Sequence, residues 1–210
     1  MSLVLLKIML GLGIVGHALN MYCDRILSVF PNGTLKLEDI KTFGEGDKMT
    51  KLLVGVSEKV PMRSAMLGAF SLMLQFLGYF SITAYVYEHS RLCGIILFFS
   101  IVLFIVVGTA HHVKYGLSEY VFLKLGRDEK AKALMVDMYK SAPITRICYV
   151  GYLVFIITLI VAIVSGVAAL PVWAVIFTVL PIFIALFPFR IIGTLHISAM
   201  VSMLAWMILI

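Results

Sequence analysis

Residues 92–113 read LCGIILFFSIVLFIVVGTAHHV, an apolar stretch with no lysine, arginine, aspartate or glutamate that ends at a pair of histidines. About 20 apolar residues in an α-helix match the thickness of the hydrocarbon core of a bilayer. The stretch therefore predicts a helix that crosses a membrane. Five other apolar runs approach or exceed that length, at about 3–22, 63–87, 145–167, 170–189 and 191–210.

The composition supports the same fold class for the whole chain. Of the 210 residues, 62% are hydrophobic and 13% are charged, whereas soluble domains are about 45–50% apolar and about 25% charged. A chain of this size could not hide such an excess inside a soluble core. We predict an all-α polytopic helix bundle with six transmembrane helices, in which residues 1–210 form a single transmembrane domain whose main partner is the lipid bilayer.

The basic residues predict the orientation of this bundle. Fifteen of the 17 lysines and arginines lie in the loops at about 23–62 and 114–146, at the edges of these loops, or at Arg190, while only Lys7 and Arg91 lie on the other side. The positive-inside rule places these loops in the cytoplasm and both termini outside a cell membrane. The net charge of +6 is therefore explained by topology, and nucleic-acid binding is not expected.

Two loop segments have helical periodicity. Apolar residues recur at helical spacing in 47–60 and in 128–140, with lysines on the opposite face. Such helices could lie along the inner leaflet, where anionic lipids attract lysine. They could equally pack on the helix bundle.

Glycines at 11, 13 and 16 match the dinucleotide-binding fingerprint, which requires a preceding strand. Within an apolar helix, they instead predict close contact with another helix. The three cysteines, Cys23, Cys93 and Cys148, have no paired spacing, so they are predicted to be packing residues.

Polar residues gather at one predicted depth in the membrane. His17, Asn20 and Asp24 follow the i, i+3, i+7 spacing of one helical face. With alternating helix directions, the histidines that end the third helix and begin the sixth fall at the same depth, near the cytoplasmic side. Ionisable residues in a membrane usually face the bundle interior or a wet cavity. The predicted ligand-binding pocket comprises His17, Asn20, Asp24, His111, His112, Arg190 and His196.

Several chemistries are compatible with this set. His17, Asp24, His111 and His196 are candidate ligands for a metal such as zinc, and two facing histidines could ligate haem. A histidine and an aspartate could instead relay protons or bind a polar head group. Alternatively, these side chains could simply sit in the wet interfacial region without a ligand. No His-Glu-x-x-His motif is present, and no catalytic residue is predicted.

Two stretches resemble a known family. Residues 16–24, GHALNMYCD, resemble the opening of an uncharacterised family of bacterial multi-pass membrane proteins, and the helix from Arg63 to Tyr79 and a histidine at the end of the third helix fit the same pattern. The resemblance covers most of the chain and implies no particular activity. Three function classes therefore remain: binding or transport of a small or lipid-like molecule, metal-dependent catalysis on a lipid-like substrate, or protein interaction without small-molecule chemistry. The oligomeric state is not predicted.

Overall fold

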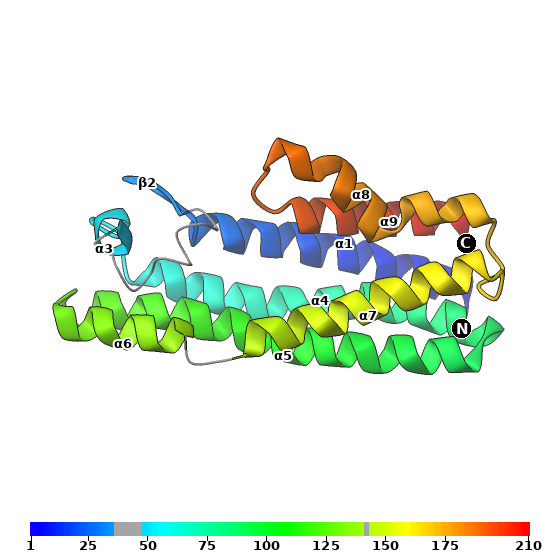
Figure 1. The fold of residues 1–210 in the computed structure, drawn as a ribbon, viewed down its shortest axis with the longest axis horizontal. Coiled ribbons are helices and arrows are strands. Elements are labelled where there is room, and N and C mark those ends of the chain that lie inside the picture. Colours follow the sequence, from blue (N-terminus) through cyan, green and yellow to red (C-terminus); the bar gives the residue numbers. More distant parts are fainter. Residues whose placement is uncertain (36–47, 141–142) are drawn as a thin grey trace.

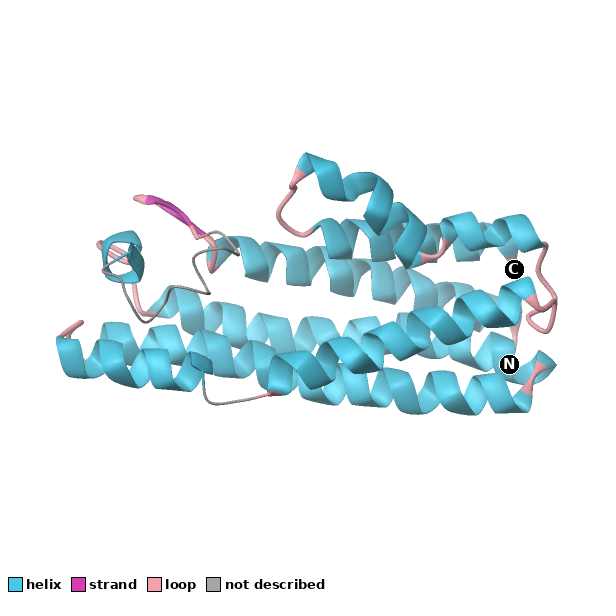
Figure 2. Ribbon diagram, in the orientation of Figure 1, coloured by secondary structure: helices cyan, strands magenta, loops and turns pink. Residues whose placement is uncertain are grey.

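The computed structural model describes residues 1–35, 48–140 and 143–210. The described part of the chain is all-α apart from one short hairpin, as predicted (Figures 1 and 2). The hairpin pairs β1, Val29–Phe30, with β2, Gly33–Thr34. The long helices are α1, Leu3–Ile26; α4, Lys59–His89; α5, Arg91–Lys124; and α7, Ile144–Val164. The short helices are α3, Lys48–Leu52; α6, Glu129–Lys140; α8, Val179–Leu186; and α9, Thr194–Leu209.

Four helices are long and apolar enough to cross a membrane, and within the described ranges they are α1, α4, α5 and α7. They correspond to the first four predicted runs, and they fit the prediction of a membrane protein. Helix α5 is longer than predicted because it continues past residue 113 to Lys124. Residues assigned to the start of a loop are therefore helical and extend beyond the predicted span.

The fifth apolar run is not one continuous helix. It consists of the 3-10 helix η1, Val172–Phe177, then α8, and then the 3-10 helix η2, Phe187–Phe189. Prolines explain these breaks, because proline lacks a backbone N–H and is tolerated only in the first turn of a helix. Pro171 precedes η1, Pro181 lies in the first turn of α8, and Pro188 lies just beyond its end. The sixth run forms α9, and the count of six spans stays a prediction.

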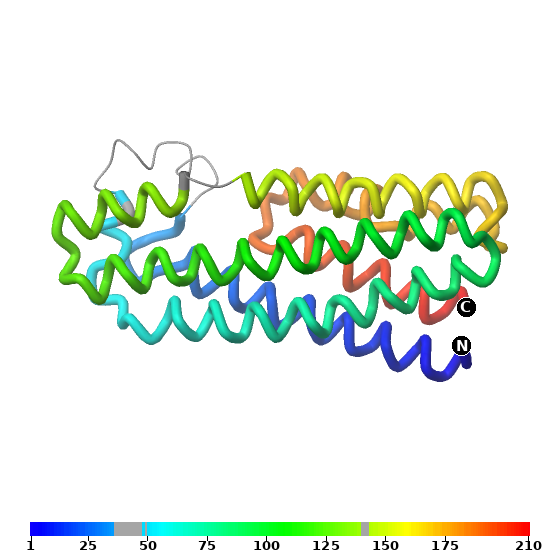
Figure 3. The backbone as a smooth tube through the Cα atoms, turned by 90° about the horizontal axis from the view of Figure 1, so that it is seen from below, coloured from blue at the N-terminus to red at the C-terminus, as the bar shows by residue number. Residues whose placement is uncertain are grey.

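The two termini lie at the same end of the bundle (Figures 1 and 3). Helix α1 packs between α4 and α9, α5 packs on α4, and α7 packs on α5. We call the opposite end of the bundle, where α1 ends and α4 begins, the basic end. Its described lysines and arginines include Arg25, Lys59, Arg63, Lys124 and Arg127.

A second apolar core lies at the basic end, separate from the core of the bundle. It joins Phe30 of the hairpin and Leu53 to Phe122 of α5 and Met135 of α6. Most of the described apolar residues that recur at helical spacing in the two loop segments are thus packed against the protein, although Leu134 is exposed. Of the two alternatives, packing on the bundle is the one that the structure shows.

Helices α1 and α4 approach each other to backbone contact through glycine. A Cβ atom on Gly13 would lie 2.7 Å from the Cα atom of Gly78, and one on Gly16 would lie 2.7 Å from the carbonyl oxygen of Ser71. No atom lies within 4 Å of such a Cβ on Gly11. Two of the three glycines therefore form the helix contact, and Gly11 does not.

We expect Gly13→Leu to lower the thermal unfolding midpoint of the detergent-purified protein, because its side chain would force α1 away from α4. Overpacking of this kind costs about 1–3 kcal/mol, occasionally more. Gly11→Leu is the matched control, since it makes the same change where space is open. Equal unfolding midpoints for the two variants would show that the stability of the protein does not depend on the close contact of Gly13 with α4.

Candidate functional site

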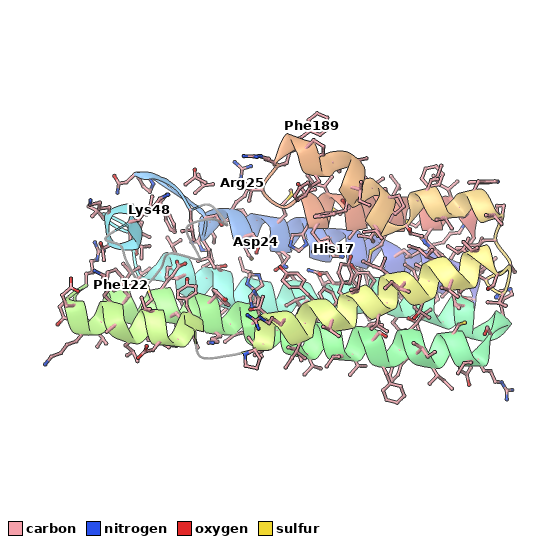
Figure 4. All side chains as sticks on the ribbon, in the orientation of Figure 1. His17, Asp24, Arg25, Lys48, Phe122 and Phe189 are labelled. Atoms are coloured by element: carbon pink, nitrogen blue, oxygen red, sulfur yellow. The ribbon has the colours of Figure 1, made fainter. Side chains whose placement is uncertain are left out.

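Three residues of α1 form one side of a buried polar network. His17 is only 1% exposed and Asn20 is also buried, whereas the Asp24 side chain is 39% exposed. Their helical spacing places them on one face, so the network runs along α1 from the bundle interior toward the basic end. Figure 4 labels His17 and Asp24, which lie along α1 in that order.

Helix α9 completes a hydrogen-bonded line with two residues of α1. The Nδ1 atoms of His17 and His196 lie 3.0 Å apart, so one of them donates a proton to the other. On the other side of the imidazole, His196 Nε2 lies 3.0 Å from Asp24 Oδ2. Both ring nitrogens of His196 are thus engaged, and the line His17–His196–Asp24 joins a fully buried ring to a half-exposed carboxyl group.

Asn20 connects this line to two further helices. Its Oδ1 atom accepts hydrogen bonds from His112 Nε2 of α5, at 2.5 Å, and from the Ser71 hydroxyl of α4, at 2.9 Å. Its Nδ2 atom lies 3.3 Å from His196 Nε2. His112 Nε2 also lies 3.7 Å from Asp24 Oδ1. Four helices therefore meet at Asn20, and the partners that buried polar groups need are supplied by neighbouring helices.

Two predicted residues lie outside this network. His111 Nδ1 shares a hydrogen bond of 2.8 Å with the Thr145 hydroxyl of α7. Arg190 is exposed, in the left-handed conformation that follows η2. In the described ranges, the hydrogen bonds and ion pairs of Asp24 reach His112 and His196 and not Arg190.

The sequence analysis missed one face of α4 that borders the site. Ser71, Gln75 and Tyr79 follow an i, i+4, i+8 spacing, which was the available signal. The Tyr79 ring meets the His17 ring edge-on at 5.5 Å, and its hydroxyl shares a 2.8 Å hydrogen bond with the Tyr152 hydroxyl of α7. Gln75 Nε2 donates to the Gly16 carbonyl at 3.5 Å.

Two buried atoms beside the network have no hydrogen-bond partner in the described part of the chain. They are His17 Nε2 and Gln75 Oε1. Buried polar atoms are nearly always paired with protein or with an ordered molecule. Because Gln75 reaches the carbonyl of the residue before His17, both unpaired atoms belong to the same stretch of the α1–α4 contact. This stretch therefore has two hydrogen-bonding atoms whose capacity the described residues do not use.

The geometry offers no support for a metal centre. Among residues 1–35, 48–140 and 143–210, no group of three His, Cys, Asp or Glu side chains is arranged to hold a metal ion. The two Nδ1 atoms that face each other, in His17 and His196, are 3.0 Å apart. Two axial haem ligands on opposite sides of the iron must lie about 4 Å apart, twice a metal–nitrogen bond of about 2.0 Å, so haem iron does not fit between these two atoms.

With Asp24 ionised, hydrogen bonding selects one set of tautomers, in which Asn20 Nδ2 and His196 Nε2 are both donors and their 3.3 Å contact is not a hydrogen bond. An ionised Asp24 only accepts hydrogen bonds, so His196 must donate from Nε2 and accept at Nδ1. His17 must then donate from Nδ1, which leaves its Nε2 as a bare acceptor.

We expect ¹⁵N NMR of histidine-labelled protein in micelles at neutral pH to show His17 as the Nδ1–H tautomer and His196 as the Nε2–H tautomer. The ¹⁵N signals that disappear in His17→Gln and in His196→Gln are assigned to these two residues. The exposed His89 provides the reference for a histidine outside the network. In Asp24→Leu, Asn20 Nδ2 becomes the remaining partner of His196 Nε2, and both tautomers should reverse. An Nε2–H tautomer of His17 in the unmodified protein contradicts this assignment.

Comparison with known proteins adds a family but no activity. No curated protein and no solved structure matches the chain. A family of unknown function matches residues 1–209, which is nearly the whole chain. The protein therefore belongs to this family of unknown function, DUF6796.

Proposed function

We propose that this protein is a multi-pass protein of the cell membrane that binds, or carries, a small polar or lipid-like molecule beside His17, and that it passes protons between this molecule and the cytoplasm. The observation that carries the proposal is the line His17–His196–Asp24. It begins at a buried, unpaired acceptor, His17 Nε2, and it ends at a half-exposed carboxyl group near the basic end.

The line can conduct one proton with a complete balance of bonds. A proton that binds His17 Nε2 releases the Nδ1 proton of His17 to His196 Nδ1. His196 in turn releases its Nε2 proton to Asp24 Oδ2. Each imidazole gains a proton on one nitrogen and loses one from the other, so both rings remain neutral. The vacated His196 Nε2 then accepts from Asn20 Nδ2, which already lies 3.3 Å away.

The unpaired atoms also define the chemistry of the ligand. With an ionised Asp24, His17 Nε2 is an acceptor, and Gln75 Oε1 is an acceptor in any state. A molecule that pairs with them must present hydrogen-bond donors, such as hydroxyl or amino groups. The Tyr79 ring beside His17 and the apolar core of the bundle favour a ligand that also has an apolar part.

The proposed topology has six spans, with the basic end in the cytoplasm and both termini outside. The positions of the charged residues support this orientation, and the common location of the termini fits an even number of crossings (Figure 1). The fifth crossing would be the interrupted segment η1–α8–η2, whose large apolar side chains Trp173, Ile184 and Phe187 are exposed. Interrupted helices are common in transporters, which supports carriage over a purely structural role.

A metal-dependent enzyme is the weaker alternative, because the described residues provide no three-ligand set. An interaction protein without small-molecule chemistry remains the other alternative. The unpaired acceptors beside His17 favour the binding site over this alternative.

The ligand proposal can be tested by thermal-shift screening of the detergent-purified protein against small polyols, amines and head-group analogues that carry hydroxyl groups. We expect molecules with hydrogen-bond donors to raise the unfolding midpoint. Binding should weaken in Gln75→Leu and His17→Phe, because each substitution removes one acceptor. His89→Phe is the matched control at an exposed position. Ligands that stabilise all variants equally would place the binding site elsewhere.

The topology can be tested by labelling single cysteines with a membrane-impermeant maleimide in a chain that lacks the native thiols. We expect His89→Cys to react in intact cells and Lys130→Cys to react only after lysis, because the two exposed positions lie at opposite ends of the bundle. Reaction of Lys130→Cys in intact cells would reverse the orientation, and would place Asp24 on the outside.

A further inference from the structure

A groove at the basic end lies outside the histidine network. It has a volume of about 570 Å³ and runs between the start of α4 and the end of α5, which lie side by side (Figure 3). Its walls consist of the apolar or aromatic residues Met62, Met66, Leu67 and Tyr120 and the basic residues Lys59 and Arg63.

The groove has a net positive charge. Its single acidic residue, Glu58, forms an ion pair with Lys124 at 3.0 Å and is thereby neutralised. Neither Lys59 nor Arg63 has an ion-pair partner within the described ranges of the chain. Two cationic groups are therefore available to an anion.

The charged and apolar residues are arranged in sequence along one face of α4. Lys59, Met62, Arg63 and Met66 follow i, i+3, i+4 and i+7 spacing, so they share this face. The two cations lie at the basic end, and Met66, which is 68% exposed, lies farther into the apolar part of the helix. A phospholipid in a leaflet has the same arrangement, with its charged head group at the membrane surface and its acyl chains in the apolar interior.

We propose that this groove binds an anionic phospholipid, with its phosphate at Lys59 and Arg63 and an acyl chain along Met62, Met66 and Leu67. Arginine suits the phosphate because its planar guanidinium can donate two parallel hydrogen bonds. Basic pockets between transmembrane helices are a recurrent type of lipid site. The site is independent of the proposed ligand site at His17.

The proposal predicts selective retention of phosphatidylglycerol over phosphatidylcholine. Native mass spectrometry of the full chain, released from micelles that contain defined amounts of each lipid, measures the apparent affinity of each. In Lys59→Gln/Arg63→Gln, the apparent affinity for phosphatidylglycerol should fall roughly 30-fold, if each cation contributes as basic residues typically do at anionic membranes. The affinity for phosphatidylcholine should not change.

Lys51→Gln/Lys130→Gln is the matched control, because it removes two exposed charges at the same end but outside the groove. This control should retain phosphatidylglycerol as the unmodified protein does. Unchanged unfolding midpoints establish that both double variants fold. An equal loss in both variants would show that attraction is diffuse and would overturn the site. Equal retention of phosphatidylglycerol and phosphatidylcholine by the unmodified protein would also overturn the site. Full displacement of phosphatidylglycerol by inorganic phosphate or by an acidic peptide would do the same.

Discussion

Polar side chains in the apolar interior of the bundle need partners, and this constraint determines how four helices are aligned. His17, Asn20, His112 and His196 are all buried. Leaving such groups unpaired in an apolar environment costs several times what a hydrogen bond between them contributes. Their mutual hydrogen bonds therefore hold α1, α4, α5 and α9 in one axial register. A shift of one turn in any of these helices would break the network.

The close approach of α1 and α4 lets short side chains reach across the helix contact. Because Gly13 and Gly78 meet at the backbone, the hydroxyl groups of Ser64 and Ser81 donate to carbonyl oxygens of α1, those of Cys23 and Leu6. These hydrogen bonds extend along most of the helix pair, and the same proximity brings Gln75 beside His17. The contact that stabilises the bundle thus also builds the wall of the proposed ligand site.

The basic end of the bundle brings together several features on which the proposals depend. The basic end has its own apolar core, which fixes α6 and the hairpin on the extended α5. Asp24 and the lipid groove both lie toward this end, so a proton acceptor and an anionic lipid would lie near the same membrane surface. The interrupted segment before α9 packs on the helix that carries His196.

The sequence by itself determined the all-α class, the four long apolar helices and the common helical face of His17, Asn20 and Asp24, because these depend on local periodicity. It could not show which of His111 and His112 joins them, since adjacent helical residues point about 100° apart and only packing selects a face. It did not show the role of Ser71, whose partner is 51 residues away. Prolines marked the fifth run and explain where it breaks, but only the structure shows that the breaks leave three short helical segments. The tertiary structure alone placed His196 against His17, 179 residues apart, because pairing between distant helices depends on how the whole bundle packs.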